Sequence, residues 1–209
     1  GCTNSNTYKT PETEMEKVSY SLGVNVATGV KAQGLDTIDA NAVAKAFNDV
    51  FEGNDLDISE EESMKVLQDY FGKLQAKKSA KANEAGAAYL AENGAKEGVI
   101  TTESGLQYEI LSTGNGAKPT TADQVTVHYH GMLTDGTVFD SSVDRGEPAT
   151  FGVTQVIKGW TEALQLMSIG DKWKLTIPSN LAYGDQGAGG MIGPGATLVF
   201  EVELLGIKN

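Results

Sequence analysis

The stretch VTVHYHGMLTDGTVFDSS, residues 125–142, decides the fold of the second half of this chain. Its apolar residues Val125, Val127 and Tyr129 alternate with polar ones, and a period of two is typical of a strand with one buried face. The Asp-Gly pair at 135–136 then predicts a tight hairpin turn, because glycine readily adopts the positive φ that such turns need. The stretch therefore indicates two antiparallel strands joined by a short turn.

Further strands are expected on both sides of this hairpin. They are indicated by alternation or short apolar runs at Leu106, Tyr108 and Ile110, and at Val138–Phe139, Lys172–Ile177 and Thr197–Leu205. One short helix is expected from Trp160 to Met167. The second half is therefore predicted to be a mainly antiparallel sheet packed against one helix, an α+β arrangement.

The first half has the three-to-four-residue period of amphipathic helices. One helix is expected over about residues 13–30, and its apolar stripe is Met15, Val18, Leu22, Val26 and Val30. A second is expected from an N-cap at Asp39 to Gly53-Asn54, and its inward residues are Val43, Phe47, Val50 and Phe51. We therefore expect an all-helical N-terminal domain.

A third helix is predicted from the capping box Ser59-Glu60-Glu61-Glu62, in which hydroxyl and carboxylate satisfy exposed amides. Residues 75–92 are rich in Ala, Lys, Asn and Glu and form almost no apolar stripe. Such a segment is typical of a solvated helix that links two domains, about 50 Å long if it is unbroken to Asn93. A flexible linker is the alternative. The expected organisation is a flexible tether at 1–12, a helical dimerisation domain with its linking helix at 13–98, and the sheet domain at 99–209.

Composition and charge exclude several classes of function. The 209 residues carry a formal net charge of −12, which argues against a nucleic-acid partner because phosphate binding needs clustered Lys and Arg. No run approaches the ~18 apolar residues of a membrane-spanning helix. The one cysteine, Cys2, permits no internal disulfide and no thiolate metal cluster.

Cys2 lies in an unusual N-terminal sequence. Gly1-Cys2 followed by a polar run at 3–7 resembles a bacterial lipoprotein junction, where a signal peptide is removed just before a cysteine that is then lipidated. The polar run would be a tether leading from the membrane. This interpretation places the protein in the bacterial cell envelope, as an outer-membrane lipoprotein facing the periplasm or the cell surface. The alternative is an incidental surface cysteine.

The sequence gives little support to a metal site, a phosphate-binding loop or a catalytic serine. His128 and His130 share one face of a strand, but a zinc site would need two more ligands and no cysteine is near. The glycine-rich segment 184–190 lacks the Lys-Ser/Thr ending of a phosphate loop and leads into a strand. Neither serine after Asp140 has an obvious base. We expect no metal and no cofactor.

What remains is a concentration of aromatic and branched residues at strand ends and loops, with one acid, Asp140, among them. They are Tyr129, Phe139, Val156, Ile157, Trp160, Tyr183 and Phe200. Each of these residues alone is typical of a hydrophobic core. Together they indicate an apolar binding pocket with few polar groups.

Four ordered motifs in residues 101–208 resemble the FKBP-type peptidyl-prolyl cis-trans isomerases. They are Val127-His128-Tyr129-x-Gly131-Met132-Leu133 with Phe139-Asp140-Ser141-Ser142, Val156-Ile157-x-Gly159-Trp160, Tyr183-Gly184, and Ala196-Thr197-Leu198-Val199-Phe200-x-Val202-x-Leu204-Leu205. Thr102-x-Ser104-Gly105-Leu106-Gln107-Tyr108, with the helical first half, further resembles the macrophage infectivity potentiator (Mip) subfamily. The resemblance implies an antiparallel half-barrel sheet wrapped on one short helix, and a homodimer joined through the N-terminal helices.

The resemblance also implies isomerisation of X-Pro bonds in the folding of exported proteins. Twisting the amide needs no proton or nucleophile, so the enzyme has only to bind the twisted amide better than the planar forms. The implied catalytic residues are Asp140, Ile157 through its amide, and Tyr183 through its hydroxyl. The residues implied to bind substrate are Tyr129, Phe139, Val156, Ile192, Phe200 and Trp160, the last beneath the proline ring.

The implied partners are proline-containing polypeptides, a second copy of the chain, and macrolide inhibitors of the tacrolimus and rapamycin type. A peptide-binding chaperone with incidental isomerase activity is the alternative function. Ala149 and Ala188 replace a pocket Phe and a loop His found in other family members, and Gln155 replaces a frequent Glu, so substrate preference and inhibitor affinity are expected to differ. Arg145 is expected to pair with Asp140 or Asp144, or to be solvated.

Overall fold

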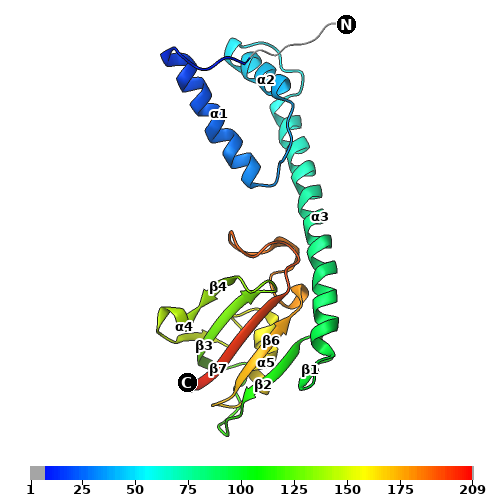
Figure 1. The fold of residues 1–209 in the computed structure, drawn as a ribbon, viewed down its shortest axis with the longest axis vertical. Coiled ribbons are helices and arrows are strands. Elements are labelled where there is room, and N and C mark those ends of the chain that lie inside the picture. The colour runs from blue at the N-terminus through cyan, green and yellow to red at the C-terminus, as the bar shows by residue number, and fades with distance from the viewer. Residues whose placement is uncertain (1–7, 209) are drawn as a thin grey trace. The chain divides into compact units, whose positions relative to one another are not determined.

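The computed structural model describes residues 8–208, so Cys2 and the polar run after it lie outside the described residues. The chain forms two compact units that divide between Leu74 and Gln75. Helix α3 (Glu60–Gly94) contributes residues to both units (Figure 1). The α+β class predicted from the sequence, with helices first and an antiparallel sheet second, is confirmed.

The first unit is helical and its helices begin at capping residues. α1 (Glu14–Ala32) starts with a capping box in which the Thr13 hydroxyl accepts from the Glu16 amide while the Glu16 carboxylate accepts from the Thr13 amide. α2 (Ala40–Glu52) starts at the predicted cap, Asp39, whose carboxylate accepts a backbone N–H at 3.0 Å.

The first unit has no hydrophobic core of its own. α3 begins as predicted at Ser59, whose hydroxyl accepts from the Glu62 amide at 3.1 Å. No residue between 8 and 74 is buried, although the helices carry many large apolar side chains. Within residues 8–208, no helix combines the length and apolar character that crossing a bilayer requires.

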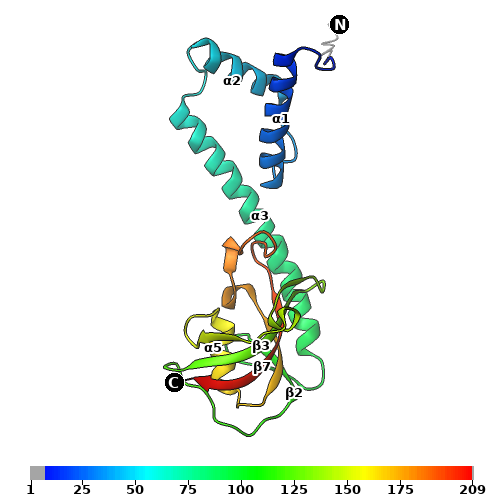
Figure 2. The ribbon, with the colours of Figure 1, turned by 90° about the vertical axis from the view of Figure 1, so that its left-hand side faces the viewer.

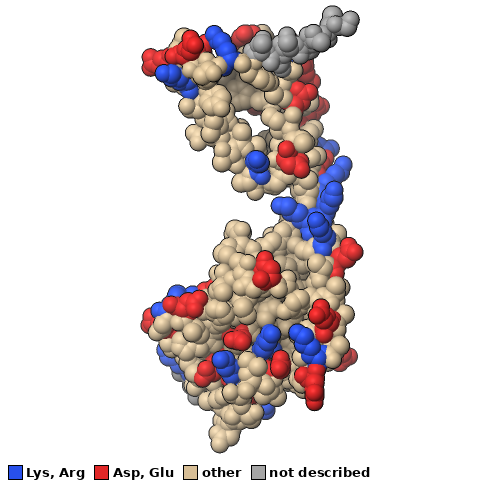
Figure 3. Space-filling model, in the orientation of Figure 1, with Lys and Arg blue, Asp and Glu red and all other residues tan. Residues whose placement is uncertain are grey.

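The second half of α3 belongs to the second unit. Most of its residues are exposed, and lysines gather along the middle of the helix (Figure 3). Ser79, Gly86 and Asn93, each seven residues from the next, are nevertheless buried. A Cβ at Gly86 would collide with the Thr197 hydroxyl, and Asn93 Nδ2 donates to Gln107 Oε1 at 2.8 Å. This contact stripe consists of small and polar residues, so it leaves no apolar pattern in the sequence.

In the described part of the chain, seven strands form one antiparallel sheet. Their order is β1-β2-β6-β7-β3-β4, and β5 also pairs with β3. The strands are β1 (Val99–Thr101), β2 (Gln107–Ser112), β3 (Gln124–Leu133), β4 (Val138–Ser141), β5 (Ala149–Gly152), β6 (Lys172–Ile177) and β7 (Leu198–Lys208). Every predicted strand is present, and the short strands β1 and β5 are additional.

The predicted hairpin joins β3 to β4. Gly136 has a φ of 90°, a region in which a side chain would be strained, and Asp135 accepts from the Thr137 amide at 2.9 Å. The chain then passes through α4 (Ser142–Arg145) to β5. This turn brings the end of β4 beside the middle of β3, where the two strands carry the residues of the candidate site.

One helix, α5 (Lys158–Leu166), packs against the sheet (Figure 2). Gly159 permits this close approach, because a Cβ there would lie 2.6 Å from Ile177 Cγ2 of β6. The core between helix and sheet is apolar and includes Val125, Val127, Ala163, Leu164, Met167, Leu175, Leu198 and Leu204. The 3₁₀ turns η1 (Ser179–Leu181) and η2 (Gly184–Gln186) follow β6.

Candidate functional site

A cavity of about 190 Å³ lies among β3, β4, β5, β7, the start of α5 and the segment around η2. It collects aromatic and branched side chains from segments that are far apart in the sequence. Its lining residues are Tyr129, Phe139, Asp140, Phe151, Gln155, Val156, Ile157, Trp160, Tyr183 and Phe200. The cavity is therefore mainly apolar, with few polar groups to orient a ligand.

The Trp160 indole is the centre of an aromatic cluster and is 4% exposed. Three rings meet it nearly edge-on, with centroid distances of 5.3 Å for Tyr129, 5.7 Å for Phe151 and 5.2 Å for Phe200. Edge-to-face packing is a favoured geometry of aromatic pairs and adds to the free energy of burial. Because the three rings come from β3, β5 and β7, they fix the indole of α5 relative to the sheet.

Gly131 of β3 makes room for one wall of the cavity. A Cβ at this position would lie 2.7 Å from Phe200 Cε1 and 2.8 Å from Phe139 Cζ, closer than real side chains approach. With no Cβ there, Phe139 and Phe200 pack edge to face with centroids 5.4 Å apart. Glycine is therefore required by packing, not by backbone conformation.

One polar network reaches the cavity. The Tyr129 hydroxyl donates to Asp140 Oδ2 at 2.6 Å, and Arg145 donates to the Tyr129 hydroxyl at 2.9 Å while it pairs with Asp140. Of the pairings expected for Arg145, the one with Asp140 is present. The network joins the middle of β3, the end of β4 and the last residue of α4.

This network controls ionisation at the cavity. Burial opposes the charged form of Asp140, but the hydrogen bonds from Tyr129 and Arg145 outweigh it and hold the pKa of Asp140 below its ordinary value of 3.8. Burial, followed by the hydrogen bond to Asp140, raises the pKa of Tyr129. Asp140 is therefore a carboxylate, and Tyr129 a neutral phenol, at neutral pH.

Ile157 and Tyr183 each contribute a further donor to the cavity lining. Ile157 is the N-cap of α5, so its amide N–H lies outside the intrahelical hydrogen bonds. Tyr183 stands just before η2 and is 42% exposed, which leaves its hydroxyl within reach of a ligand. Val156 lies beside Ile157 in the lining.

The cavity unites the residues that the sequence singled out, except Ile192 and Cys2. Ile192 is 8% exposed, packs in the core and is absent from the cavity lining, while its backbone pairs with that of Ala188. Cys2 lies outside the described residues. The remaining predicted residues, Tyr129, Phe139, Asp140, Val156, Ile157, Trp160, Tyr183 and Phe200, all line one cavity.

Phe151 is a lining residue that the sequence analysis did not identify. Ala149 and Phe151 lie two residues apart on β5 and are both partly buried, with the exposed Thr150 between them. Phe151 therefore faces the same side of β5 as Ala149, and its ring lines the cavity. The alternation of Ala149, Thr150 and Phe151 could have indicated a strand with Phe151 on its buried face, but β5 was not predicted as a strand.

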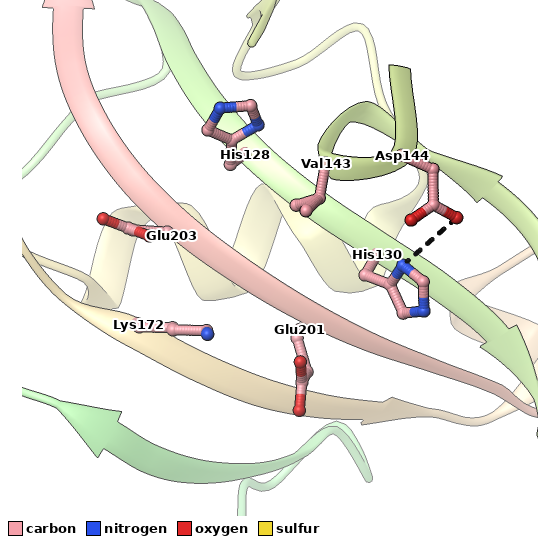
Figure 4. A pocket seen from close by; sticks show the side chains of 7 residues that line it. All are labelled: His128, His130, Val143, Asp144, Lys172, Glu201 and Glu203. Atoms are coloured by element: carbon pink, nitrogen blue, oxygen red, sulfur yellow. Dashed lines mark ion pairs between the residues drawn. The ribbon is translucent and has the colours of Figure 1, made fainter. Parts of the chain in front are cut away.

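His128 and His130 lie on the opposite face of β3 from Tyr129. Their Nδ1 atoms are 2.9 Å from the Ser142 hydroxyl and 2.7 Å from the Ser141 hydroxyl, so both rings take part in ordinary hydrogen bonds. Figure 4 shows the two rings around a second cavity, which is also lined by Val143, Asp144, Lys172, Glu201 and Glu203. Among residues 8–208, no group of three or more His, Cys, Asp or Glu is arranged to hold a metal ion.

Comparison with known families defines the class of this protein. Residues 115–205 match the family model described as FKBP-type peptidyl-prolyl cis-trans isomerase, and residues 15–110 match the domain amino terminal to FKBP-type peptidyl-prolyl isomerase. The chain belongs to the FKBP family and is a peptidyl-prolyl cis-trans isomerase.

Individual relatives narrow the class to its Mip-like members. The chain is 45% identical over 204 residues to "Outer membrane protein MIP" of Legionella longbeachae, covering 94% of this chain and 87% of the relative. It is 46% identical to the "FKBP-type 22 kDa peptidyl-prolyl cis-trans isomerase" of Escherichia coli, covering 96% and 99%. The crystal structure of FkpA from Escherichia coli matches with a TM-score of 0.71 and 33% identity, covering 95% and 99%. These relatives favour the isomerase over the chaperone alternative.

Replacing Arg145 by Met is expected to raise the pKa of Asp140 toward its ordinary value, because Arg145 supplies two of the interactions that lower it. A titration of the Asp140 carboxyl carbon by NMR measures the shift. A lowered folded-state pKa means that ionised Asp140 stabilises the fold above its ordinary pKa, and that this contribution is lost as pH falls through the folded pKa. An unchanged Asp140 midpoint, or an equal rise in an Asp144→Asn control, would contradict this account of the network.

Proposed function

We propose that the cavity binds an X-Pro segment with the proline ring on the Trp160 indole and accelerates isomerisation by binding the twisted amide more tightly than either planar form. The supporting observation is an apolar cavity whose floor is one indole, packed against three other rings. The ~18–20 kcal/mol barrier comes from amide resonance, which twisting removes without any proton transfer. A thousandfold acceleration needs a differential binding free energy of only about 4 kcal/mol.

An apolar cavity favours the twisted amide for a simple reason. The planar amide is the more polar form and gains more from water, so removing water raises its free energy more than that of the twisted form. The rings of Tyr129, Phe139 and Phe200, together with Val156, exclude water around the bond. The cavity thus selects the transition state by solvation as well as by shape.

The polar groups orient the substrate in this proposal. The Ile157 amide and the Tyr183 hydroxyl donate to substrate carbonyls on either side of the twisting bond. An ionised carboxylate has no proton to donate to a carbonyl oxygen, and both oxygens of Asp140 are engaged by Tyr129 and Arg145. Asp140 therefore acts by holding these two side chains in place.

Trp160→Leu is expected to lower kcat/KM for an X-Pro peptide by about 10- to 100-fold, because the flat floor is lost while an apolar side chain remains. Tyr183→Phe is expected to lower it by about three- to tenfold, the value of one net hydrogen bond. A protease-coupled assay and a proline-limited refolding assay both measure the rate.

Trp173→Leu is the matched control for the loss of an indole. Trp173 is also 4% exposed, but it stacks on Tyr108 with centroids 4.2 Å apart and is not a lining residue of the cavity. When rates are compared at equal concentrations of folded protein, Trp173→Leu should have the same kcat/KM as the unchanged protein. A tacrolimus-type macrolide, which we propose as a competing ligand of the cavity, should lose affinity only for the Trp160 variant. Equal losses in both variants would overturn the assignment of the cavity as the site.

The exposed apolar face of the first unit supports a second proposal, that two copies of the chain dimerise through residues 13–74. A unit with no buried residue needs a partner to remove its apolar side chains from water. The large apolar residues of the three helices that are more than 50% exposed are Met15, Val18, Tyr20, Val50, Phe51, Met64, Val66 and Leu67. Figure 3 shows uncharged surface along α1 between charged groups at its ends. A two-fold homodimer would bury the same apolar patch on both copies.

Phe51→Glu is expected to raise the dimer dissociation constant by at least about 30-fold, because Phe51 is 79% exposed and would place a charge in the apolar interface. Sedimentation over a range of protein concentrations measures the dissociation constant. Ile110→Glu, at a residue of β2 that is 47% exposed, is the control and should leave it unchanged. A monomeric unchanged protein, or dissociation by both variants, would contradict dimerisation through the first unit.

The N-terminal sequence supports a third proposal, a lipid anchor on Cys2 that holds the protein in the bacterial envelope, at the outer membrane. The resemblance of Gly1-Cys2 and the polar run to a lipoprotein junction, and the name of the Legionella relative, are what support it. Mass spectrometry of the N-terminal peptide from native membranes should show an acylated Cys2. An unmodified cysteine in that fraction would refute the anchor.

A further inference from the structure

Leu181 and Ala182 pack against the hydrophobic core, but the segment that begins at Tyr183 is held less firmly. Tyr183 is 42% exposed, and η2, which follows it directly, contains no buried residue. The position of a side chain on such a segment depends on the contacts that fix the backbone before and after it. Besides the core packing of Leu181 and Ala182, the hydrogen bonds that flank Tyr183 therefore help to fix the position of its hydroxyl.

Those contacts come from the second half of α3. After Tyr183, the Ser79 hydroxyl donates to Asp185 Oδ1 at 2.5 Å, and Gln75 Nε2 donates to the Asp185 carbonyl at 2.8 Å. Before Tyr183, the Ser179 hydroxyl donates to Asn83 Oδ1 at 2.5 Å. Ser79 and Asn83, one helical turn apart, thus hold the segment on both sides of Tyr183.

The hydrogen bonds form one continuous chain. Asn83 Nδ2 donates to the Ser79 hydroxyl at 3.3 Å, so each of the two helix residues supports the other while it binds the segment. Ser79 is 4% exposed and Ser179 is 8% exposed, which strengthens these bonds relative to bonds in water. The chain therefore runs from Ser179 through α3 to Asp185.

Close packing adds to these bonds. The Gly195 amide donates to the Gly184 carbonyl at 2.9 Å, which closes the loop after Tyr183. Gly195 also meets α3, because a Cβ there would lie 2.5 Å from the Ser79 carbonyl oxygen and 2.9 Å from Asn83 Nδ2. The same turn of the helix therefore contacts the loop at its start, at Asp185, and at its end, at Gly195.

We propose that Ser79 and Asn83 are positioning residues for the isomerase reaction: α3 holds the Tyr183 segment so that the hydroxyl is in place before substrate binds. The inference rests on the proposed role of Tyr183 in binding a substrate carbonyl. It extends the functional site beyond the sheet domain, to a helix that the sequence presented as a linker. Pre-placing the donor avoids an ordering cost at the moment of reaction.

The test is a double-mutant cycle in the full-length protein. Ser79→Ala alone should lower kcat/KM by about two- to fivefold. The Tyr183 segment loses the hydrogen bond from Ser79 to Asp185, so the Tyr183 hydroxyl is correctly placed less often. In a Tyr183→Phe background, the same substitution should change kcat/KM by less than about 1.5-fold, because no hydroxyl remains to be positioned. A purely structural role would give the same loss in both backgrounds.

Substitutions at two further positions, Asp185 and Asn93, keep the test independent of general damage to the fold. Asp185→Ala should reproduce the loss, whereas Asp185→Asn, which keeps an acceptor oxygen for Ser79, should retain most of the activity. Asn93→Ala removes hydrogen bonds from α3 to Gln107 of β2 and Thr176 of β6, both of which lie outside the segment from Ser179 to Gly195. It should lower the melting temperature but leave kcat/KM of the folded protein unchanged.

These experiments distinguish a failure of the positioning role of Ser79 and Asn83 from a failure of the proposed role of Tyr183. If Tyr183→Phe leaves the rate unchanged, the assigned role of Tyr183 fails and the positioning inference fails with it. If Tyr183→Phe lowers the rate while Ser79→Ala does not, or if the two losses are additive, the positioning inference alone is overturned. A loss in Ser79→Ala and Asp185→Ala that disappears without the Tyr183 hydroxyl supports it.

Discussion

The edge-to-face packing of three aromatic rings on the Trp160 indole is the interaction on which the isomerase unit depends. Tyr129, Phe151 and Phe200 belong to three different strands, and Trp160 belongs to the helix that covers them. The same contacts therefore close the core and form the floor of the cavity. A substitution that loosened this cluster would alter the fold and the site together, and Gly131 must remain free of a side chain for the adjoining wall to exist.

A reaction without proton transfer explains why this cavity has so few polar groups. The enzyme has to distinguish two shapes of one amide, which requires rigid walls and the exclusion of water more than it requires acids and bases. The one carboxylate, Asp140, is bound by Tyr129 and Arg145, and its lowered pKa keeps it charged. In our proposal Asp140 holds the Tyr129 and Arg145 side chains in place, and Ser79 and Asn83 of α3 give similar support to the Tyr183 segment.

Much of this architecture could be predicted from local pattern. Alternation found β2 and β3, the Asp135-Gly136 pair found the hairpin, and capping residues located the starts of α2 and α3. The ordered aromatic motifs identified most of the cavity lining from the sequence alone. These features succeed because each depends on a few neighbouring residues whose physical preference agrees with the final fold.

The parts that could not be predicted depend on contacts between distant segments. Phe151 lies on a four-residue strand whose pairing with β3 only the folded sheet reveals. The Ser79, Gly86 and Asn93 stripe packs by smallness and hydrogen bonding, and neither leaves an apolar pattern to detect. Ile192 illustrates the opposite case, because its apolar character is equally suited to a cavity wall and to the core position it occupies.

In our proposal a proline ring rests on the Trp160 indole while the X-Pro amide twists. Exchange and cross-relaxation NMR of an X-Pro peptide with the full-length protein tests it directly, since one sample reports both the cis-trans exchange rate and the protons near the ring. We expect accelerated exchange together with contacts between proline ring protons and the Trp160 indole. Accelerated exchange with peptide contacts at the His128 and His130 face instead, and none to the indole, would contradict it.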